Sequence, residues 1–228
     1  MTAKKPQNGK KRILLVDDHP VVREGFAQLI NHEPDLVVCA QTGSPAEAAG
    51  LVKRHQPHLA IVDLSLGDTS GLTLVRDLLC REPALPILIL SMHDESTYAE
   101  RALRSGARGF VMKQAPVEEV MKAIHAVLSG DNYVSERIKA QMVATLVAGQ
   151  KPASLLERLS DRELEVFGLI GRGKTTREIA AAIGISIKTV ETYRGHIKEK
   201  IGAHNGAELG RQAAAWVARE EAPQNQPS

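Results

Sequence analysis

The stretch Ile13-Leu14-Leu15-Val16-Asp17-Asp18 places four aliphatic residues directly before two carboxylates. Similar short apolar runs recur through the first half of the chain, at Leu36–Cys39, Leu59–Val62, Ile87–Leu90 and Phe110–Met112. Between them lie helix-length stretches whose apolar residues recur every three or four positions. Because parallel strands need crossover helices, five such units predict a doubly wound α/β fold, a parallel (βα)5 sheet covered on both faces.

Sequence signals also mark where helices begin and end in this half. Ser44-Pro45-Ala46-Glu47 has the pattern of an N-cap serine, a proline at the first helical position and a glutamate that reaches back. Pro116 opens another helix, which we expect to run to about Ser129 because Gly130 follows.

The composition excludes several classes of protein. Of the 228 residues, 43% are hydrophobic and 25% charged, which is typical of a soluble globular chain. Two cysteines cannot build a disulfide framework. The apolar runs are far shorter than the roughly 18–20 residues of a membrane span, and the N-terminus has no signal-peptide core. We therefore expect a cytoplasmic protein without a membrane partner.

The chain divides into regions of different charge and pattern. We expect a disordered basic N-terminus at 1–10, an α/β domain at 11–130, and a linker at 131–157 with an amphipathic helix at 135–148. A small all-α domain at 158–221 and a disordered tail at 222–228 complete the chain. Residues 11–130 hold 12 basic and 15 acidic side chains, whereas residues 151–228 hold 12 basic and 10 acidic ones. The basic excess of the second half suggests an anionic polymer as its partner.

Polar side chains follow four of the five predicted strands. Asp17 and Asp18 follow the first strand, Asp63 the third, Ser91 the fourth and Lys113 the fifth. The carboxyl ends of parallel strands form the ligand-binding edge of such sheets, so these groups should converge. Clustered carboxylates repel one another unless a cation such as Mg2+ joins them, and a carboxylate can also serve as a nucleophile. Helix capping would account for any one of these acids, but not for the whole set.

The motifs Val16-Asp17-Asp18-His19-Pro20, Val62-Asp63-Leu64-Ser65-Leu66, Leu90-Ser91-Met92 and Phe110-Val111-Met112-Lys113 carry a family resemblance. Over residues 11–130 the chain resembles the receiver domain of bacterial two-component response regulators. The resemblance implies that Asp63 accepts a phosphoryl group from a sensor histidine kinase. It also implies that Asp18, Asp63 and the backbone carbonyl of Ser65 bind Mg2+, and that Asp17 acts through a metal-bound water.

The same resemblance implies a switch. Ser91 and Phe110 stand where receivers carry their switch pair, and Lys113 would orient the phosphoryl oxygens together with Ser91. The chain has serine rather than threonine at 91 and phenylalanine rather than tyrosine at 110. The missing phenol hydroxyl leaves the readout at position 110 open.

The second half of the chain has only helical patterns. Ser160-Asp161-Arg162-Glu163 and Thr175-Thr176-Arg177-Glu178 are capping boxes, Gly184 ends a short helix, and Ser186 caps the next one up to about Ile201. Two helices joined by a tight glycine turn predict a helix-turn-helix. The exposed face of the second helix would present Lys188, Glu191, Thr192, Gly195, Lys198 and Glu199, with Arg194 at its edge.

A second resemblance follows from Leu159-Ser160-x-Arg162-Glu163, Gly173, Glu178-Ile179-Ala180, Ser186-x-Lys188-Thr189-Val190 and Lys200-Ile201-Gly202. This pattern is similar to LuxR-type DNA-binding domains, and the whole chain resembles NarL/FixJ-type response regulators. The resemblance implies double-stranded DNA as a partner, with Lys188 and Thr189 on phosphates and Glu191, Thr192 and Gly195 facing bases. It also implies a homodimer through a last helix at Ala207–Ala218, the receiver being a second candidate surface.

Three other interpretations compete with a phosphorylation-controlled transcription factor that is not an enzyme beyond slow self-dephosphorylation. Gly168–Thr175 matches the P-loop pattern GxxxxGK[ST], but a P-loop needs a preceding strand and a large α/β domain. A metal-dependent phosphatase or phosphotransferase would use the acidic residues but leave the helical half without a purpose. A regulator that binds DNA without phosphorylation would not need the acidic set.

Overall fold

The computed structural model describes residues 9–67, 69–147 and 155–220, and it divides into two compact units, residues 1–140 and 141–228. Of the terminal segments predicted to be disordered, only residues 9 and 10 are described. The joint predicted at 149–154 lies outside the described residues. The division falls within α6 (Glu136–Val147), where the sequence predicts a linker helix.

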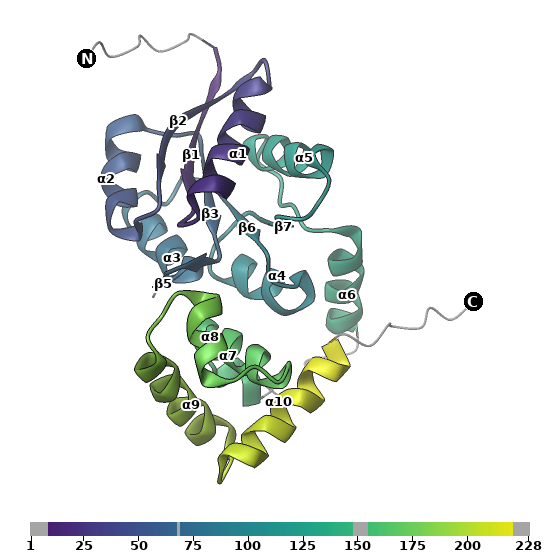
Figure 1. Ribbon diagram of the computed structural model, residues 1–228. Coiled ribbons are helices and arrows are strands. Elements are labelled where there is room, and N and C mark those ends of the chain that lie inside the picture. Colours follow the sequence, from purple (N-terminus) through teal and green to yellow (C-terminus); the bar gives the residue numbers. More distant parts are fainter. Residues whose placement is uncertain (1–8, 68, 148–154, 221–228) are drawn as a thin grey trace. The chain divides into compact units, whose positions relative to one another are not determined.

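The first unit contains a five-stranded parallel sheet in the order β2-β1-β3-β6-β7 (Figure 1). The strands are β1 (Lys11–Val16), β2 (Leu36–Thr42), β3 (Leu59–Asp63), β6 (Ile87–Ser91) and β7 (Gly109–Met112). The order reverses direction between β1 and β3, so loops at the carboxyl ends of these two strands diverge and leave room for a site.

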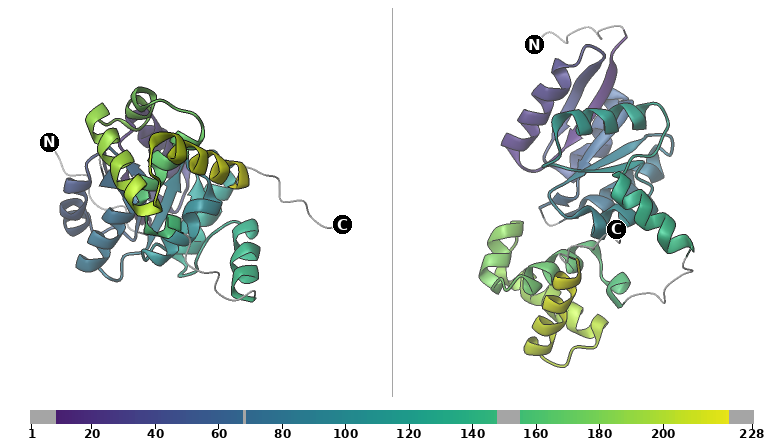
Figure 2. Two further views of the ribbon diagram at one scale, coloured as in Figure 1. Left: turned by 90° about the horizontal axis from the view of Figure 1, so that it is seen from below. Right: turned by 90° about the vertical axis from the view of Figure 1, so that its right-hand side faces the viewer.

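Helices cover both faces of this sheet, as Figures 1 and 2 show. They are α1 (Pro20–His32), α2 (Pro45–His55), α3 (Gly71–Arg81), α4 (Glu95–Arg104) and α5 (Val117–Leu128). One core cluster joins residues of α1 and α5 to alternate residues of the strands, among them Ile13, Leu15, Ile61, Leu90 and Val111. The intervening residues Leu14, Val16, Val62 and Ile89 are also buried, so both faces are apolar and the expected doubly wound fold is confirmed.

Two local features differ from the sequence prediction. Ser44 occupies the cap position of α2, but its side chain makes no capping hydrogen bond. The Thr42 hydroxyl instead accepts from the Ser44 N–H at 3.0 Å and donates to Glu47 Oε2 at 2.6 Å, so Glu47 reaches back to Thr42. A short hairpin of β4 (Ser65–Leu66) and β5 (Thr69–Ser70) follows β3 and was not foreseen, since two-residue strands leave no periodic pattern.

The second unit is built from helices, as predicted. They are the 3-10 turn η1 (Leu155–Arg158) and the α-helices α7 (Asp161–Gly171), α8 (Thr176–Ile183), α9 (Ile187–Ile201) and α10 (Gly206–Glu220). Both predicted capping boxes are formed, at Ser160 and at Thr175. Gly184 and Gly202 end α8 and α9 in the left-handed conformation, which glycine adopts without strain. The P-loop interpretation fails here, because Gly168–Gly171 belong to α7 rather than to a strand end.

The core of this unit lies between α7, α9 and α10. Its buried side chains include Phe167, Val190, Ile197 and Leu209, and the rings of Phe167 and Trp216 lie 5.6 Å apart. In the part of the chain that the structure describes, no helix is long and apolar enough to cross a membrane.

Gly71 lets α3 begin directly against the backbone of β3, and this close approach generates a prediction. A Cβ at position 71 would lie 2.0 Å from the carbonyl oxygen of Asp63. We expect Gly71→Ala to destabilise the first unit by about 2 kcal/mol, because backbone atoms cannot move aside as a side chain can. The measurement is hydrogen exchange of the amides of β3.

Gly25→Ala is the matched control for this prediction. Gly25 is an exposed position within α1, and a Cβ there would meet nothing within 4 Å. The control should leave protection of the same amides unchanged or raise it by about 0.5 kcal/mol. Equal protection in the two variants would contradict the account of Gly71.

Candidate functional site

The carboxyl ends of β1, β3 and β7 bring three charged side chains into direct contact. Lys113 Nζ lies 2.6 Å from Asp17 Oδ2 and 2.8 Å from Asp63 Oδ2. All three side chains are less than 10% exposed, so the ammonium acts in a region of weak solvent screening. Asp17, Asp63 and Lys113 are distant in sequence, and in the structure they meet at this edge of the sheet as expected.

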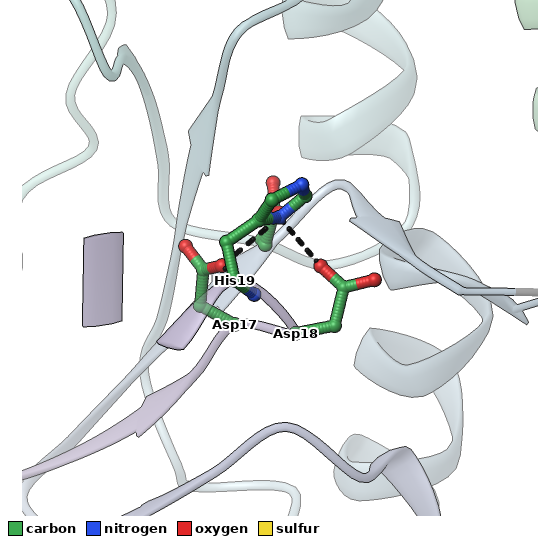
Figure 3. A group of neighbouring side chains, drawn as sticks. Asp17, Asp18 and His19 are labelled. Carbon is green, nitrogen blue, oxygen red and sulfur yellow. Dashed lines mark hydrogen bonds and ion pairs between the residues drawn. The ribbon is translucent and has the colours of Figure 1, made fainter. Parts of the chain in front are cut away.

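Asp18 and His19 lie beside this group in the loop that leads from β1 to α1 (Figure 3). His19 Nδ1 lies 2.7 Å from Asp18 Oδ1 and 3.5 Å from Asp17 Oδ1. Asp18 Oδ2 accepts a hydrogen bond of 2.7 Å from the Gly67 N–H, which ties the β1 end to the hairpin after β3. No role was predicted for His19, although its position directly after the acid pair was an available signal.

The donor set fits a divalent cation. Ligand atoms of Asp17, Asp18, His19 and Asp63 lie within 4.8 Å of one another. Asp18 Oδ1 is buried and accepts no hydrogen bond, although the His19 ring nitrogen lies close to it. A buried carboxylate oxygen whose partner is one ring nitrogen is stabilised further by a hard cation, and oxygen ligands are those Mg2+ prefers.

Burial changes the acidity of Asp63. It raises the pKa of this carboxyl to about 6, and the nearby Asp17 carboxylate acts in the same direction. The Lys113 ammonium and the Ser65 backbone hydrogen bond lower the pKa but do not overcome the burial. Burial destabilises the charged form of this carboxylate. The group is therefore stabilised most when a cation or a covalent bond removes part of its charge.

The remaining predicted residues of the first unit lie in β6, in β7 and in the hairpin after β3. The Ser91 hydroxyl is fully buried and accepts from the His93 N–H at 2.9 Å. The Ser65 hydroxyl hydrogen-bonds His93 Nε2 at 2.8 Å. Phe110 is 1% exposed, so its ring is already packed inside the protein.

The second candidate site is the surface of α9. Ser186 caps this helix by accepting from the Thr189 N–H at 3.0 Å, and Val190, Ile197 and Ile201 form its buried stripe. The predicted DNA-facing residues divide by exposure: Lys188, Glu191, Thr192 and Gly195 are exposed, whereas Thr189, Arg194 and Lys198 are half-buried. The helix therefore leaves four of the seven predicted residues exposed, and a groove-binding helix needs such an exposed face.

The raised pKa of Asp63 makes the stability of the metal-free protein depend on pH. In the unfolded chain the pKa of this group is near its ordinary value of 3.8, and in the folded protein it is about 6. The folded state thus binds the proton first, so this group stabilises folding increasingly as the pH falls from 7 to 5. Because the amide in Asp63→Asn cannot titrate, the free energy of unfolding of wild type relative to that variant should rise by about 1 kcal/mol between pH 7 and 5.

Urea unfolding with a chelator present, followed by hydrogen exchange of the β3 amides, measures this difference. Glu100→Gln, a change at an exposed carboxylate that pairs with the permanently charged Arg104, is the control for general effects of acid removal. A difference that falls or stays constant over this range would show that Asp63 keeps an ordinary pKa.

Comparisons with known proteins match both halves of the chain to known families. Residues 13–125 match the family described as the response regulator receiver domain, and residues 157–213 match bacterial regulatory proteins of the luxR family. The oxygen regulatory protein NreC of Staphylococcus carnosus is 36% identical over 204 residues, which cover 87% of this chain and 94% of NreC. The transcriptional regulatory protein UhpA of Salmonella typhimurium is 38% identical over 197 residues, covering 86% and 94%.

A solved structure is similar over nearly the whole chain. It is RcsB from Salmonella enterica serovar Typhimurium, bound to promoter P1flhDC in the presence of the phosphomimetic BeF3−, with 25% identity and a TM-score of 0.55. The likeness covers 89% of this chain and 97% of RcsB. With both family models matched in the expected order, the chain belongs to the two-component response regulators of the NarL/FixJ type, transcriptional regulators that join a receiver domain to a LuxR-type DNA-binding domain.

Proposed function

We propose that Asp63 is the phosphoryl acceptor and that the donor is a phosphohistidine of a sensor histidine kinase. A carboxylate oxygen of Asp63 attacks phosphorus, the P–N bond of the donor breaks, and the released imidazole takes up a proton. The observation that carries this proposal is the contact of Lys113 with both Asp17 and Asp63, because it places a cation where phosphoryl oxygens would gather.

The metal assignment follows the donor set. Asp18, Asp63 and the backbone carbonyl of Ser65 would hold Mg2+, and Asp17 would act through a bound water. When bound, Mg2+ offsets the negative charge of the carboxylates and of the incoming phosphoryl oxygens. The buried position of Asp63 limits access of water to the acyl phosphate, so self-dephosphorylation would be slow. We propose no other catalytic turnover for this protein.

The switch would use Ser91 at the end of β6 and Phe110 in β7, together with Lys113, which contacts Asp63. Ser91 would exchange its contact with the His93 N–H for one with the phosphoryl group, while Lys113 stays with the phosphoryl oxygens and Phe110 stays inward. A phosphoryl group that makes these contacts in only one conformation biases the equilibrium toward it. Moving the active fraction from about 1% to about 99% needs about 5.5 kcal/mol of such bias.

The output is DNA binding by a dimer. We assign Lys188 and Thr189 to contacts with DNA phosphates. Glu191, Thr192 and Gly195 would face the bases. Arg194 and Lys198 would lie beside the DNA backbone. Two chains would pair through residues 207–218 of α10, with the receiver as a second surface, and place two α9 helices roughly 10 bp apart. The solved structure of RcsB bound to a promoter supports DNA as the partner. Since the proposed partners are a kinase and the chromosome, we place the protein in the cytoplasm.

Phosphorylation and DNA binding are tested together with Asp63→Asn. Incubated with acetyl phosphate and Mg2+, the wild type should gain one phosphoryl group and bind promoter DNA more tightly, whereas Asp63→Asn should do neither. Intact-protein mass and DNA affinity give the two readouts. Asp35→Asn, which changes a carboxylate outside the acidic group, should behave as wild type.

Two results would contradict the proposal. Labelling of Asp63→Asn would move the acceptor to another residue. Turnover of small phosphate esters, with DNA affinity indifferent to Asp63, would favour the phosphatase interpretation instead.

Lys188→Ala tests the orientation of α9 on DNA. Loss of one phosphate contact should weaken binding to all DNA sequences alike and reduce the slope of log affinity against log salt by about 0.9. Lys139→Ala, which removes an exposed cation from α6, should leave the slope as it is. An unchanged slope in Lys188→Ala would place this end of α9 away from the phosphates.

A further inference from the structure

The first turn of α4 and the start of α6 are joined by polar contacts around one carboxylate. Glu95 Oε1 accepts a hydrogen bond of 2.8 Å from the Ser135 hydroxyl. The same oxygen lies 3.3 Å from Arg137 Nε and 3.2 Å from Arg137 Nη2. Arg137 Nη2 also lies 3.8 Å from Asp94 Oδ1. We call Glu95, Ser135 and Arg137 the α4–α6 latch.

The latch is more than a surface ion pair. The Glu95 side chain is only 15% exposed, although that of Arg137 is 60% exposed, so the carboxylate end is shielded from water. The Ser135 hydroxyl accepts from the Ile138 N–H at 3.3 Å and caps α6 while it donates to Glu95. The carboxylate thus lies at the N-terminus of α6, where the helix dipole favours a negative charge. The first turn of α6 is therefore fixed to α4.

The segment before α6 is bound to β7 as well. The Tyr133 N–H donates to the Arg108 carbonyl and the Phe110 N–H donates to the Tyr133 carbonyl, each at 2.9 Å. Val134 and Ile138, which flank the start of α6, are buried. The entry into α6 consequently touches both elements that adjoin the proposed switch: β7 contains Phe110, and α4 follows Ser91.

We infer that the α4–α6 latch transmits the state of Asp63 to the linker helix, with Glu95 as a positioning residue for the first turn of α6. This inference rests on the proposed function, because it needs a receiver whose α4 region responds to phosphorylation. The helix α6 contains the point at which the chain passes from the first compact unit to the second. A displacement of α4 moves the N-cap of α6 directly while the latch is closed, and does so much less once the latch is open.

Glu95→Gln weakens the latch, because it removes the charge that pairs with Arg137 and keeps the size of the side chain. In the full chain, acetyl phosphate should label the variant at the wild-type rate, since Glu95 does not touch the acidic group. The gain in DNA affinity on phosphorylation should fall by about fivefold or more relative to wild type, the range of ordinary coupling between sites. Phosphorylation should also change hydrogen exchange of the α6 amides 139–147 in wild type and leave it unchanged in Glu95→Gln.

The matched control is Glu136→Gln. Glu136 is the neighbour of Ser135 on the same helix, but its carboxylate pairs with Lys139 and its side chain is 86% exposed. It should behave as wild type in labelling, DNA affinity and exchange. Arg137→Gln should reproduce Glu95→Gln, and the double variant should be no worse than either single one.

The outcomes separate the latch from the proposed function. A wild-type gain in DNA affinity in Glu95→Gln would overturn the inference, and so would loss of labelling, since Glu95 would then act within the acceptor site or the fold. If wild-type protein itself is not labelled, or is labelled without a change in DNA affinity, the proposed function fails and the latch has no signal to carry.

Discussion

Three carboxylates at one edge of a sheet repel one another, and the rest of the first unit is arranged to make that repulsion tolerable. Lys113 contributes the only charge in contact with both Asp17 and Asp63 within the described part of the chain. It does not fully compensate them, because burial still raises the pKa of Asp63 to about 6. A carboxylate whose negative charge is only partly neutralised binds a cation with a favourable free energy. That binding free energy can be coupled to a change of conformation.

Much of this arrangement could be predicted from the sequence. Apolar runs that end in Asp17, Asp63 and Lys113 suffice to predict a parallel sheet and the convergence of those residues, because the geometry of parallel strands is general. The capping boxes at Ser160 and Thr175 were equally evident, since each joins neighbours in sequence. The family resemblance then named roles for these residues, and the matches over both domains confirm the family.

What escaped prediction depends on side-chain packing between segments. Ser44 makes no capping hydrogen bond and Glu47 accepts from the Thr42 hydroxyl instead, a choice of partner that the local pattern does not fix. The raised pKa of Asp63 depends on burial from several elements, and the contact of Ser135 with Glu95 joins residues 40 positions apart. Neither the contacts nor the burial of Asp63 follows from a regular spacing of residues in the sequence.

The side chains at the ends of β1 and β3 must surround one divalent ion if the receiver is to act as described. Paramagnetic Mn2+ in place of Mg2+, followed by the broadening of backbone amide signals, tests this without reference to activity. We expect broadening at low Mn2+ that is confined to residues around Asp17, Asp63 and Gly67 and is reversed by excess Mg2+. Broadening spread over exposed acidic side chains such as Glu118 and Glu136, with the ends of these strands unaffected, would contradict it.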